Sequence, residues 1–196
     1  MLNIGLAGAK NSGKDTAAAY LVWRYGYTRL AFADRLKRAA LALNPYVDVD
    51  DDGRPVRLAS LVRRYGWEYA KEHVNSAGER EVRTLLQRLG DEAGRQVHGE
   101  RIWIDPVLEQ IRATDGPVVV SDVRYPNEID ELRRLGFVIL QVVRPAAGEL
   151  SDVSRHASER DLRSRCDGVL WNDGTVEDLH DRLDDVLSTW GSRVSV

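Results

Sequence analysis

Cysteine is nearly absent from the sequence, since only Cys166 occurs among 196 residues. A single cysteine excludes an intramolecular disulfide, and such low usage is typical of a reducing compartment. Long apolar runs are also missing, because the first run, Leu2 to Ala7, is interrupted at Gly8 and Lys10. Without a basic segment before it, this run is expected to be neither a signal peptide nor a membrane span.

An excess of positive charge is absent as well. The formal net charge is −3 and the pI is near 5.8, so no general affinity for nucleic acid or an anionic membrane is expected. With 43% hydrophobic and 30% charged residues, the composition is that of an ordinary globular protein. The length favours a single domain, residues 1–196, with its own core.

Lysine is scarce, and its few positions are informative. Four of the 28 basic residues are lysines, and two of these, Lys10 and Lys14, fall in one short loop. The loop follows the first apolar run and precedes an alanine-rich segment expected to be a helix. Its spacing of Gly8, Gly13 and Lys14 matches the phosphate-binding motif G-x-x-x-x-G-K, which needs this strand–loop–helix context. The alternative is a glycine turn with a chance lysine.

We interpret this segment as a phosphate loop for ATP, in which backbone N–H groups, the start of the helix and Lys14 surround the phosphates. The residues of the loop expected to bind ATP are Gly8, Lys10, Asn11, Ser12, Gly13, Lys14, Asp15 and Thr16. The general motif has Ser or Thr directly after the lysine, whereas here Asp15 precedes Thr16. A carboxylate also suits Mg²⁺, directly or through water.

Strands alternate with helices along the chain. Apolar runs bounded by glycine or proline favour buried strands, and apolar residues at i, i+3, i+4 and i+7 favour helices. The clearest helical stripe is Val82, Leu85, Leu86 and Leu89. Strands are expected at residues 2–7, 27–33, 118–121, 137–143 and 168–171, and helices at 16–24, 34–43, 57–65, 79–97, 101–112, 127–135 and from 175. Residues 48–55 are expected to form a surface loop.

This order predicts an α/β protein with a three-layer α/β/α fold and a mostly parallel sheet. An arginine-rich segment at about 144–165 is usually a solvated loop. Beside a phosphate loop it is also suited to close over phosphates as a lid.

Two charged residues, Asp122 and Arg124, follow the buried run that begins at Val118. In open α/β sheets ligands bind at the carboxyl ends of strands. Asp122 is therefore a candidate Mg²⁺ ligand, with Asp15 and Thr16, although a cap on the following turn is an equal alternative. Phosphoryl transfer needs positive charge, a metal and in-line geometry, so the whole set favours a small-molecule kinase.

These motifs, in this order, resemble those of the deoxynucleoside monophosphate kinases encoded by tailed bacteriophages. The blocks that carry the resemblance are Gly8–Thr16, Phe32–Lys37, Arg83–Gly90, Trp103–Asp105, Ser121–Glu128, His156–Glu159 and Trp171–Thr175. The Asp-Thr ending of the loop is shared with that family. Residues 48–55 and 66–78 match little.

The resemblance implies transfer of the ATP γ-phosphoryl group to a deoxynucleoside monophosphate, with Mg²⁺, in the cytoplasm (of the host if the chain is phage-encoded). The implied catalytic residues are Lys14, Asp122, Arg124 and Arg155. The implied fold is a three-layer α/β/α P-loop kinase fold, with an acceptor-binding helical region at about 34–113 inside the single domain. The implied acceptor contacts are Lys37, Arg83, Gln87, Trp103, Arg124 and Glu128. Asn172 is implied beside the ATP, and Arg155, His156, Glu159 and Arg160 in the lid.

Other interpretations stay open at this point. The chain could phosphorylate another small acceptor, such as dephospho-coenzyme A or phosphomevalonate, or be a nucleotide-binding regulator without turnover. A DNA-translocating ATPase is disfavoured by the acidic pI and the lack of a basic stripe. The expected partners are small-molecule substrates, with neither nucleic acid nor membrane, and a homodimer is left open.

Overall fold

The structure, a computed structural model, describes residues 1–145 and 162–191. It contains two compact units: the first is Met1–Phe32 together with the described part of Val107–Val196, and the second is Ala33–Pro106. That residues 1–196 act as a single domain stays a prediction.

The first unit is built on a five-stranded sheet. Its strands are β1 (Asn3–Ala7), β2 (Thr28–Leu30), β5 (Val118–Val123), β6 (Phe137–Val143) and β7 (Gly168–Trp171). Their order is β2-β5-β1-β6-β7, and every neighbouring pair is parallel. Central parallel strands are covered on both faces, which explains why their sequences are apolar runs without alternation. The expected parallel sheet is confirmed.

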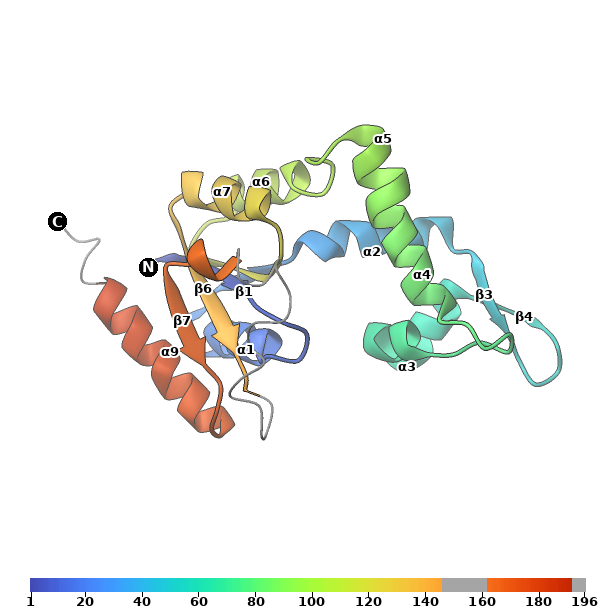
Figure 1. The fold of residues 1–196 in the computed structure, drawn as a ribbon, viewed down its shortest axis with the longest axis horizontal. Helices are drawn as coiled ribbons and strands as arrows, with labels where there is room; N and C mark the ends of the chain where they lie inside the picture. The colour runs from blue at the N-terminus through green and yellow to red at the C-terminus, as the bar shows by residue number, and fades with distance from the viewer. Residues whose placement is uncertain (146–161, 192–196) are drawn as a thin grey trace. The chain divides into compact units, whose positions relative to one another are not determined.

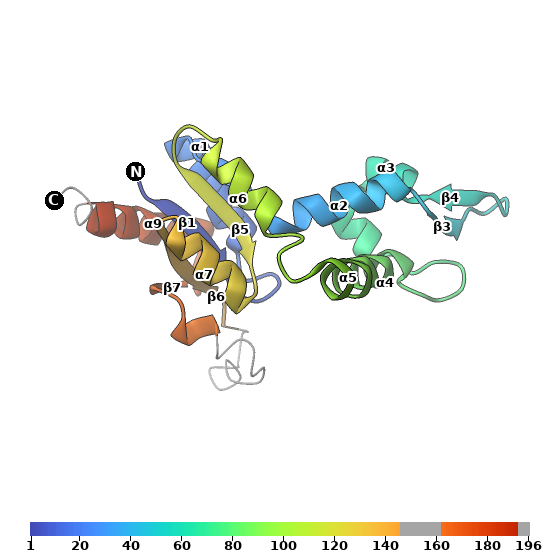
Figure 2. The same ribbon diagram turned by 90° about the horizontal axis from the view of Figure 1, so that it is seen from above.

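Helices cover both faces of this sheet (Figures 1 and 2). They are α1 (Lys14–Tyr25), α6 (Asp105–Arg112), α7 (Pro126–Arg134) and α9 (Val176–Gly191). On the face of α1 and α9, Leu21 and Leu179 share a buried cluster with Ile4 of β1. On the other face, a Cβ built on Gly5 would lie 3.3 Å from Leu132 Cδ1 of α7. The three-layer α/β/α fold is confirmed.

The second unit is mainly helical. Its elements are α2 (Phe32–Leu43), β3 (Tyr46–Val49), β4 (Pro55–Arg57), α3 (Leu58–Glu72), α4 (Glu81–Arg88), the π-helical segment η1 (Leu89–Arg95) and α5 (Gln96–His98). The stripe expected from the spacing is confirmed, because Val82 is buried in this unit's core and Leu85, Leu86 and Leu89 pack against it.

The expected helix over 79–97 differs in its interior from the structure. The helical path is π-helical over Leu89–Arg95, where Trp103 packs against two glycines. The Trp103 Nε1–H group donates to the Gly90 carbonyl at 2.9 Å, and a Cβ on Gly94 would lie 2.8 Å from the indole. Gly94 makes room for the ring, a constraint that helical periodicity does not contain.

Several other elements have different boundaries in the structure from those predicted. Residues 48–55 are not wholly a loop, because β3 pairs with β4 in an antiparallel hairpin. The helix expected to end at Tyr65 continues to Glu72, with a non-helical Gly66 (φ 79°) at its kink. The strand expected over 27–33 is shorter, since Phe32 already begins α2. The helix expected from residue 101 begins at Asp105.

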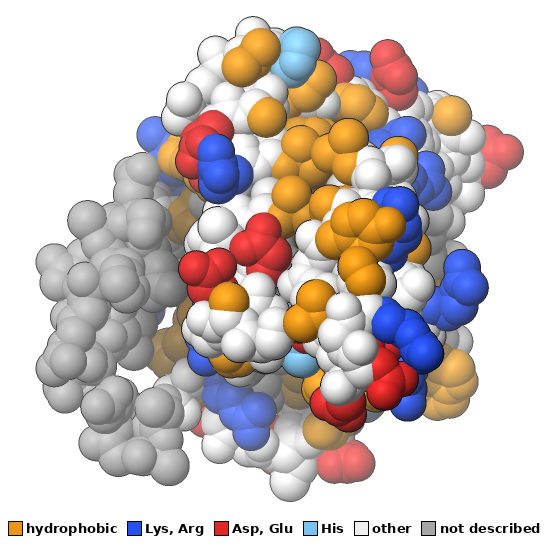
Figure 3. Space-filling view, turned by 90° about the vertical axis from the view of Figure 1, so that its right-hand side faces the viewer, with side chains coloured by type: hydrophobic (Ala, Val, Ile, Leu, Met, Phe, Trp, Pro, Cys, Tyr) orange, Lys and Arg blue, Asp and Glu red, His pale blue; other side chains and the backbone are white. Residues whose placement is uncertain are grey.

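Hydrophobic side chains gather between charged ones on the side of the second unit that carries β3 and β4 (Figure 3). The exposed large hydrophobic residues of this unit are Leu43, Tyr46, Val49, Tyr65, Tyr69, Val74 and Val97. Two of them stack on α3, with the ring centroids of Tyr65 and Tyr69 4.6 Å apart. Among the described helices, none has both the length and the apolar character needed to cross a bilayer.

Candidate active site

The loop between β1 and α1 has the backbone of an anion-binding turn. Its φ angles are positive at Gly8 (137°), Asn11 (63°) and Gly13 (105°). Space also demands glycine at the first position, because a Cβ on Gly8 would lie 2.3 Å from the Val142 carbonyl oxygen. α1 starts at Lys14, and the first N–H groups of a helix lack intrahelical acceptors. Such a terminus binds phosphate well.

Lys14 lies against this loop. Its Nζ donates to the Gly8 carbonyl at 2.9 Å and to the Ala9 carbonyl at 2.6 Å. The ammonium group is therefore positioned by the loop backbone itself. That Lys14 and the loop bind ATP stays a prediction.

A pocket of about 500 Å³ opens beside the loop. The residues that line it come from the loop, the end of β6 and the turn after β7: Ala9, Lys10, Asn11, Ser12, Arg144, Pro145, Asn172, Asp173 and Gly174. Sequence reasoning missed Asp173 and Gly174 as lining residues and treated Arg144 only as part of the arginine-rich segment. The available signal was that both segments directly follow strands of a parallel sheet.

Asp122 holds the connection between β2 and α2. Its Oδ1 accepts the backbone N–H of Phe32 at 2.8 Å. This contact is made with the start of α2, 90 residues away in the sequence, and not with the turn that follows Asp122, which was the capping alternative. A metal-binding role for Asp122 stays a prediction.

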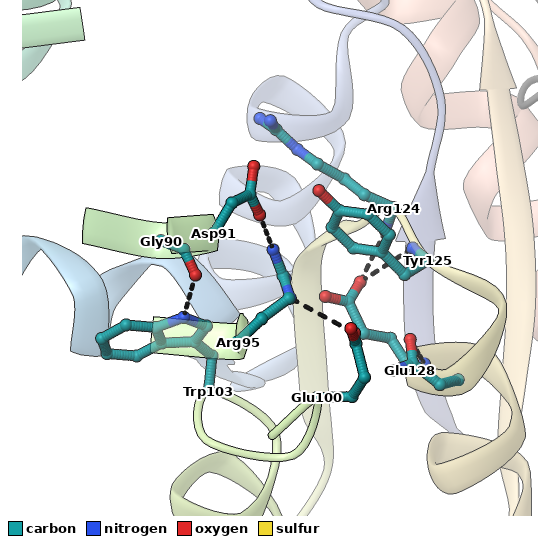
Figure 4. A network of polar contacts seen from close by, with 9 residues as sticks. Gly90, Asp91, Arg95, Glu100, Trp103, Arg124, Tyr125 and Glu128 are labelled. Atoms are coloured by element: carbon teal, nitrogen blue, oxygen red, sulfur yellow. Dashed lines mark hydrogen bonds and ion pairs between the residues drawn. The ribbon is translucent and has the colours of Figure 1, made fainter. Parts of the chain in front are cut away.

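Arg124 is exposed just after β5, and its backbone is fixed by Glu128 (Figure 4). Glu128 is 2% exposed, and its Oε2 accepts the N–H groups of Arg124 at 2.7 Å and Tyr125 at 3.1 Å. This carboxylate forms the capping box that starts α7. The structure therefore places Glu128 as a support for the Arg124 backbone.

A family model described as deoxynucleotide monophosphate kinase matches residues 58–183, which is more than half of the chain. The chain belongs to this family. The resemblance found in its motifs is confirmed.

Two viral relatives illustrate the relationship. A protein of Acanthamoeba polyphaga mimivirus, provisionally named a deoxynucleotide monophosphate kinase, is 32% identical over 187 residues, covering 93% of this chain and 94% of that protein. The deoxynucleoside-5′-monophosphate kinase of Escherichia phage T5 is 39% identical over 89 residues, covering 42% of this chain and 35% of that protein.

A solved structure supports the fold. Shikimate kinase from Aquifex aeolicus superposes with a TM-score of 0.50 at 13% identity, covering 100% of both chains. At that identity the likeness concerns the fold alone, and it agrees with the three-layer P-loop kinase fold of this family member.

Four of the six acceptor residues expected from the family, Lys37, Arg83, Gln87 and Trp103, lie in the second unit, where most are engaged in local contacts. Lys37 Nζ lies 3.9 Å from Asp34 Oδ1 and 5.9 Å from the centre of the Trp67 ring. Arg83 forms an ion pair with Glu72, and Gln87 is exposed. The indole N–H of Trp103 donates to the Gly90 carbonyl (Figure 4). Their roles toward an acceptor stay predictions.

The residues around the loop fit a magnesium ion of the kind that kinases use. Asp15, with 88% of its side chain exposed, and Thr16 are both accessible at the start of α1. The described residues hold no cluster of three or more His, Cys, Asp or Glu. Mg²⁺ at such sites is bound by one or two carboxylates together with substrate phosphates and water. The donor set thus fits a metal that arrives with its nucleotide.

The nucleotide itself also fits the loop. Ser12 is 3% exposed, and its hydroxyl has no hydrogen-bond partner in the described part of the chain, which leaves it able to serve a bound group.

The expected lid residues Arg155, His156, Glu159 and Arg160 lie outside the described residues.

Proposed function

We propose that this chain transfers the γ-phosphoryl group of ATP to the 5′-monophosphate of a deoxynucleoside, giving ADP and a deoxynucleoside diphosphate. The observation that carries this proposal is the phosphate loop, with Lys14 bonded to its carbonyls, in a member of the deoxynucleotide monophosphate kinase family. The presence of Lys14, Asp122 and Arg124 together argues against a nucleotide-binding regulator without turnover.

The loop N–H groups and Lys14 would hold the β- and γ-phosphates. Mg²⁺, held by Asp15 or Thr16 and by Asp122, supplies charge neutralisation on the transferred group when bound. Because phosphoryl transfer asks little covalent chemistry of the protein, these residues act by placing phosphates and balancing charge.

For the acceptor, we propose that Lys37, Arg83 and Arg124 bind its phosphate. Arg83 would exchange its ion pair with Glu72 for a phosphate, which a guanidinium group binds in the same bidentate manner as a carboxylate. Gln87 and Trp103 would border the base or sugar, and Glu128 would act by holding Arg124. Arg155 and Arg160 would close from the lid.

The test is ADP release from ATP and Mg²⁺ with a panel of acceptors: four deoxynucleoside monophosphates, AMP, GMP and dephospho-coenzyme A. Turnover that depends on one or more deoxynucleoside monophosphates, at about 1–100 per second, is expected. Chelation of Mg²⁺ should abolish it, and adding the metal back should restore it.

Two outcomes would overturn the proposal. Activity with dephospho-coenzyme A alone would keep the mechanism and discard the acceptor. ATP binding without transfer to any acceptor would favour a nucleotide-binding regulator.

A further inference from the structure

We infer that Asn172 is a positioning residue that clamps the phosphate loop, acting on the loop backbone and not on the base of the nucleotide. The inference rests on the proposed function only in that the loop must bind phosphate. Asn172 lies directly after β7, and it is 160 residues from the loop in sequence.

The side-chain amide makes a buried contact with the loop. Asn172 Nδ2 donates to the Ser12 carbonyl at 2.8 Å, and Asn172 is only 8% exposed. Its backbone N–H donates to the Val143 carbonyl at 2.7 Å, just past the last β6–β7 pair, Val143 with Trp171. Asn172 is therefore hydrogen-bonded to the edge of the sheet, and the pairing of β6 with β7 determines where its side-chain amide lies.

This contact orients a functional peptide. The described chain has no cis peptide bond, so the carbonyl of Ser12 and the N–H of Gly13 point to opposite sides of their shared peptide plane. Holding the carbonyl toward Asn172 turns the Gly13 N–H away from it. Gly13 immediately precedes α1, and a correctly aimed N–H at this position is what a phosphate oxygen requires.

The loop is shaped to receive the clamp. A Cβ built on Gly13 would lie 2.4 Å from Asn172 Nδ2, closer than any real side chain allows. Gly13 also has a φ of 105°, which side chains rarely adopt. One glycine thus serves both the turn and the approach of the amide.

Helix α9 holds the residues on both sides of Asn172. Arg182 donates to the Trp171 carbonyl and pairs with Asp173 Oδ1 at 2.6 Å, so the residues on either side of Asn172 are tied to the helix. Asp178 Oδ2 accepts the Thr175 N–H at 2.7 Å and so closes the turn that follows. A residue fixed from two sides holds its partner in a narrow range of orientations.

Direct contact with the nucleotide base is the competing role, because Asn172 also lines the pocket. Inorganic tripolyphosphate separates the two roles, since it has phosphates but no base. If Asn172 aims the loop, its loss weakens tripolyphosphate and ATP equally. If Asn172 contacts the base, its loss weakens ATP alone.

The experiment compares the affinities of the full chain and of Asn172→Leu for ATP and for tripolyphosphate, both with Mg²⁺. Leucine keeps the size and the backbone N–H but removes the donor without adding charge. We expect about a tenfold loss of affinity for both ligands, because the loop without the clamp spends only part of its time with the Gly13 N–H aimed at the phosphate site. The KM for ATP should rise while the KM for the acceptor stays unchanged. Gln110→Leu, which makes the same exchange on α6, should change neither affinity.

Unchanged tripolyphosphate affinity in Asn172→Leu, or loss for ATP alone, would overturn the inference. If Asn172→Leu does not fold, Asn172→Ala, which only shortens the side chain, carries the same comparison. Failure of the proposed function has a different signature: the wild-type chain would bind tripolyphosphate but transfer no phosphate to any acceptor.

Discussion

The buried carboxylate of Glu128 accepts the backbone N–H of Arg124 at 2.7 Å, although sequence reasoning assigned Glu128 to the acceptor. Glu128→Ala should leave the N–H groups of Arg124 and Tyr125 without this acceptor and lower the free energy of unfolding by about 1–3 kcal/mol. Glu128→Gln, which keeps a carbonyl oxygen, should lose less. Urea unfolding measures both. Equal losses in the two variants would contradict the supporting role.

Lys14 supplies a second prediction. Lys14→Ala should lower kcat by about 100-fold or more, the loss typical when a group that stabilises transferred charge is removed, and far-UV circular dichroism should stay unchanged. Lys71→Ala is the control, because Lys71 is a lysine of the second unit that pairs with Glu68. Retained turnover in Lys14→Ala would contradict the proposed function.

Gly13 and Asn172 should be energetically coupled. Gly13→Ala places a methyl group against the Asn172 amide at a strained φ, which should cost about 1–3 kcal/mol of unfolding free energy. In the double variant Gly13→Ala/Asn172→Ala the clash is relieved, so the combined cost should fall short of the sum of the single costs by about 0.5 kcal/mol or more. Strictly additive costs would show that the two residues do not press on each other.

Trp103 is expected to matter for stability. Trp103→Phe removes the donor to the Gly90 carbonyl and should lower the free energy of unfolding by about 1–3 kcal/mol. Trp23→Phe, at a side chain that is 79% exposed, should change it little. An unchanged stability in Trp103→Phe, with a raised acceptor KM, would instead assign the indole mainly to the acceptor.

The buried hydroxyl of Tyr27 is expected to make the free energy of unfolding fall in alkali. Its hydroxyl donates to the Leu2 carbonyl at 2.7 Å, and burial, with a smaller effect of Tyr25, raises the pKa of Tyr27 from 10.0 to about 12. A raised pKa in the folded state means that the neutral form contributes stability fully below pH 10, and this contribution is lost as the pH rises through about 12.

Two pKa units correspond to about 2.7 kcal/mol. The difference in unfolding free energy between the wild type and Tyr27→Phe should therefore shrink between pH 9 and pH 12. The other tyrosines are common to both proteins and cancel in this difference. A difference that is independent of pH would contradict the prediction.

The elements whose signals are local could be predicted from the amino-acid sequence. Gly8, Gly13 and Lys14 identify the phosphate loop because the loop's function depends on their spacing along the chain. The apolar runs at β1, β5 and β6 indicate strands covered on both faces, and the helix expected from residue 175 begins where Thr175 and Asp178 bond to each other's backbone N–H groups. These features need only a few consecutive residues, so the sequence contains all the information about them.

Which distant residues meet depends on how the chain folds in three dimensions. In the strand order β2-β5-β1-β6-β7, only β6 separates β1 from β7. The residue after β7, Asn172, therefore reaches Ser12 in the loop that follows β1. A second such contact joins the indole of Trp103 to Gly94, which lies in the π-helical segment η1. Periodicity reports which face of a segment is apolar, whereas these contacts depend on how separate segments cross in space, which no local pattern specifies.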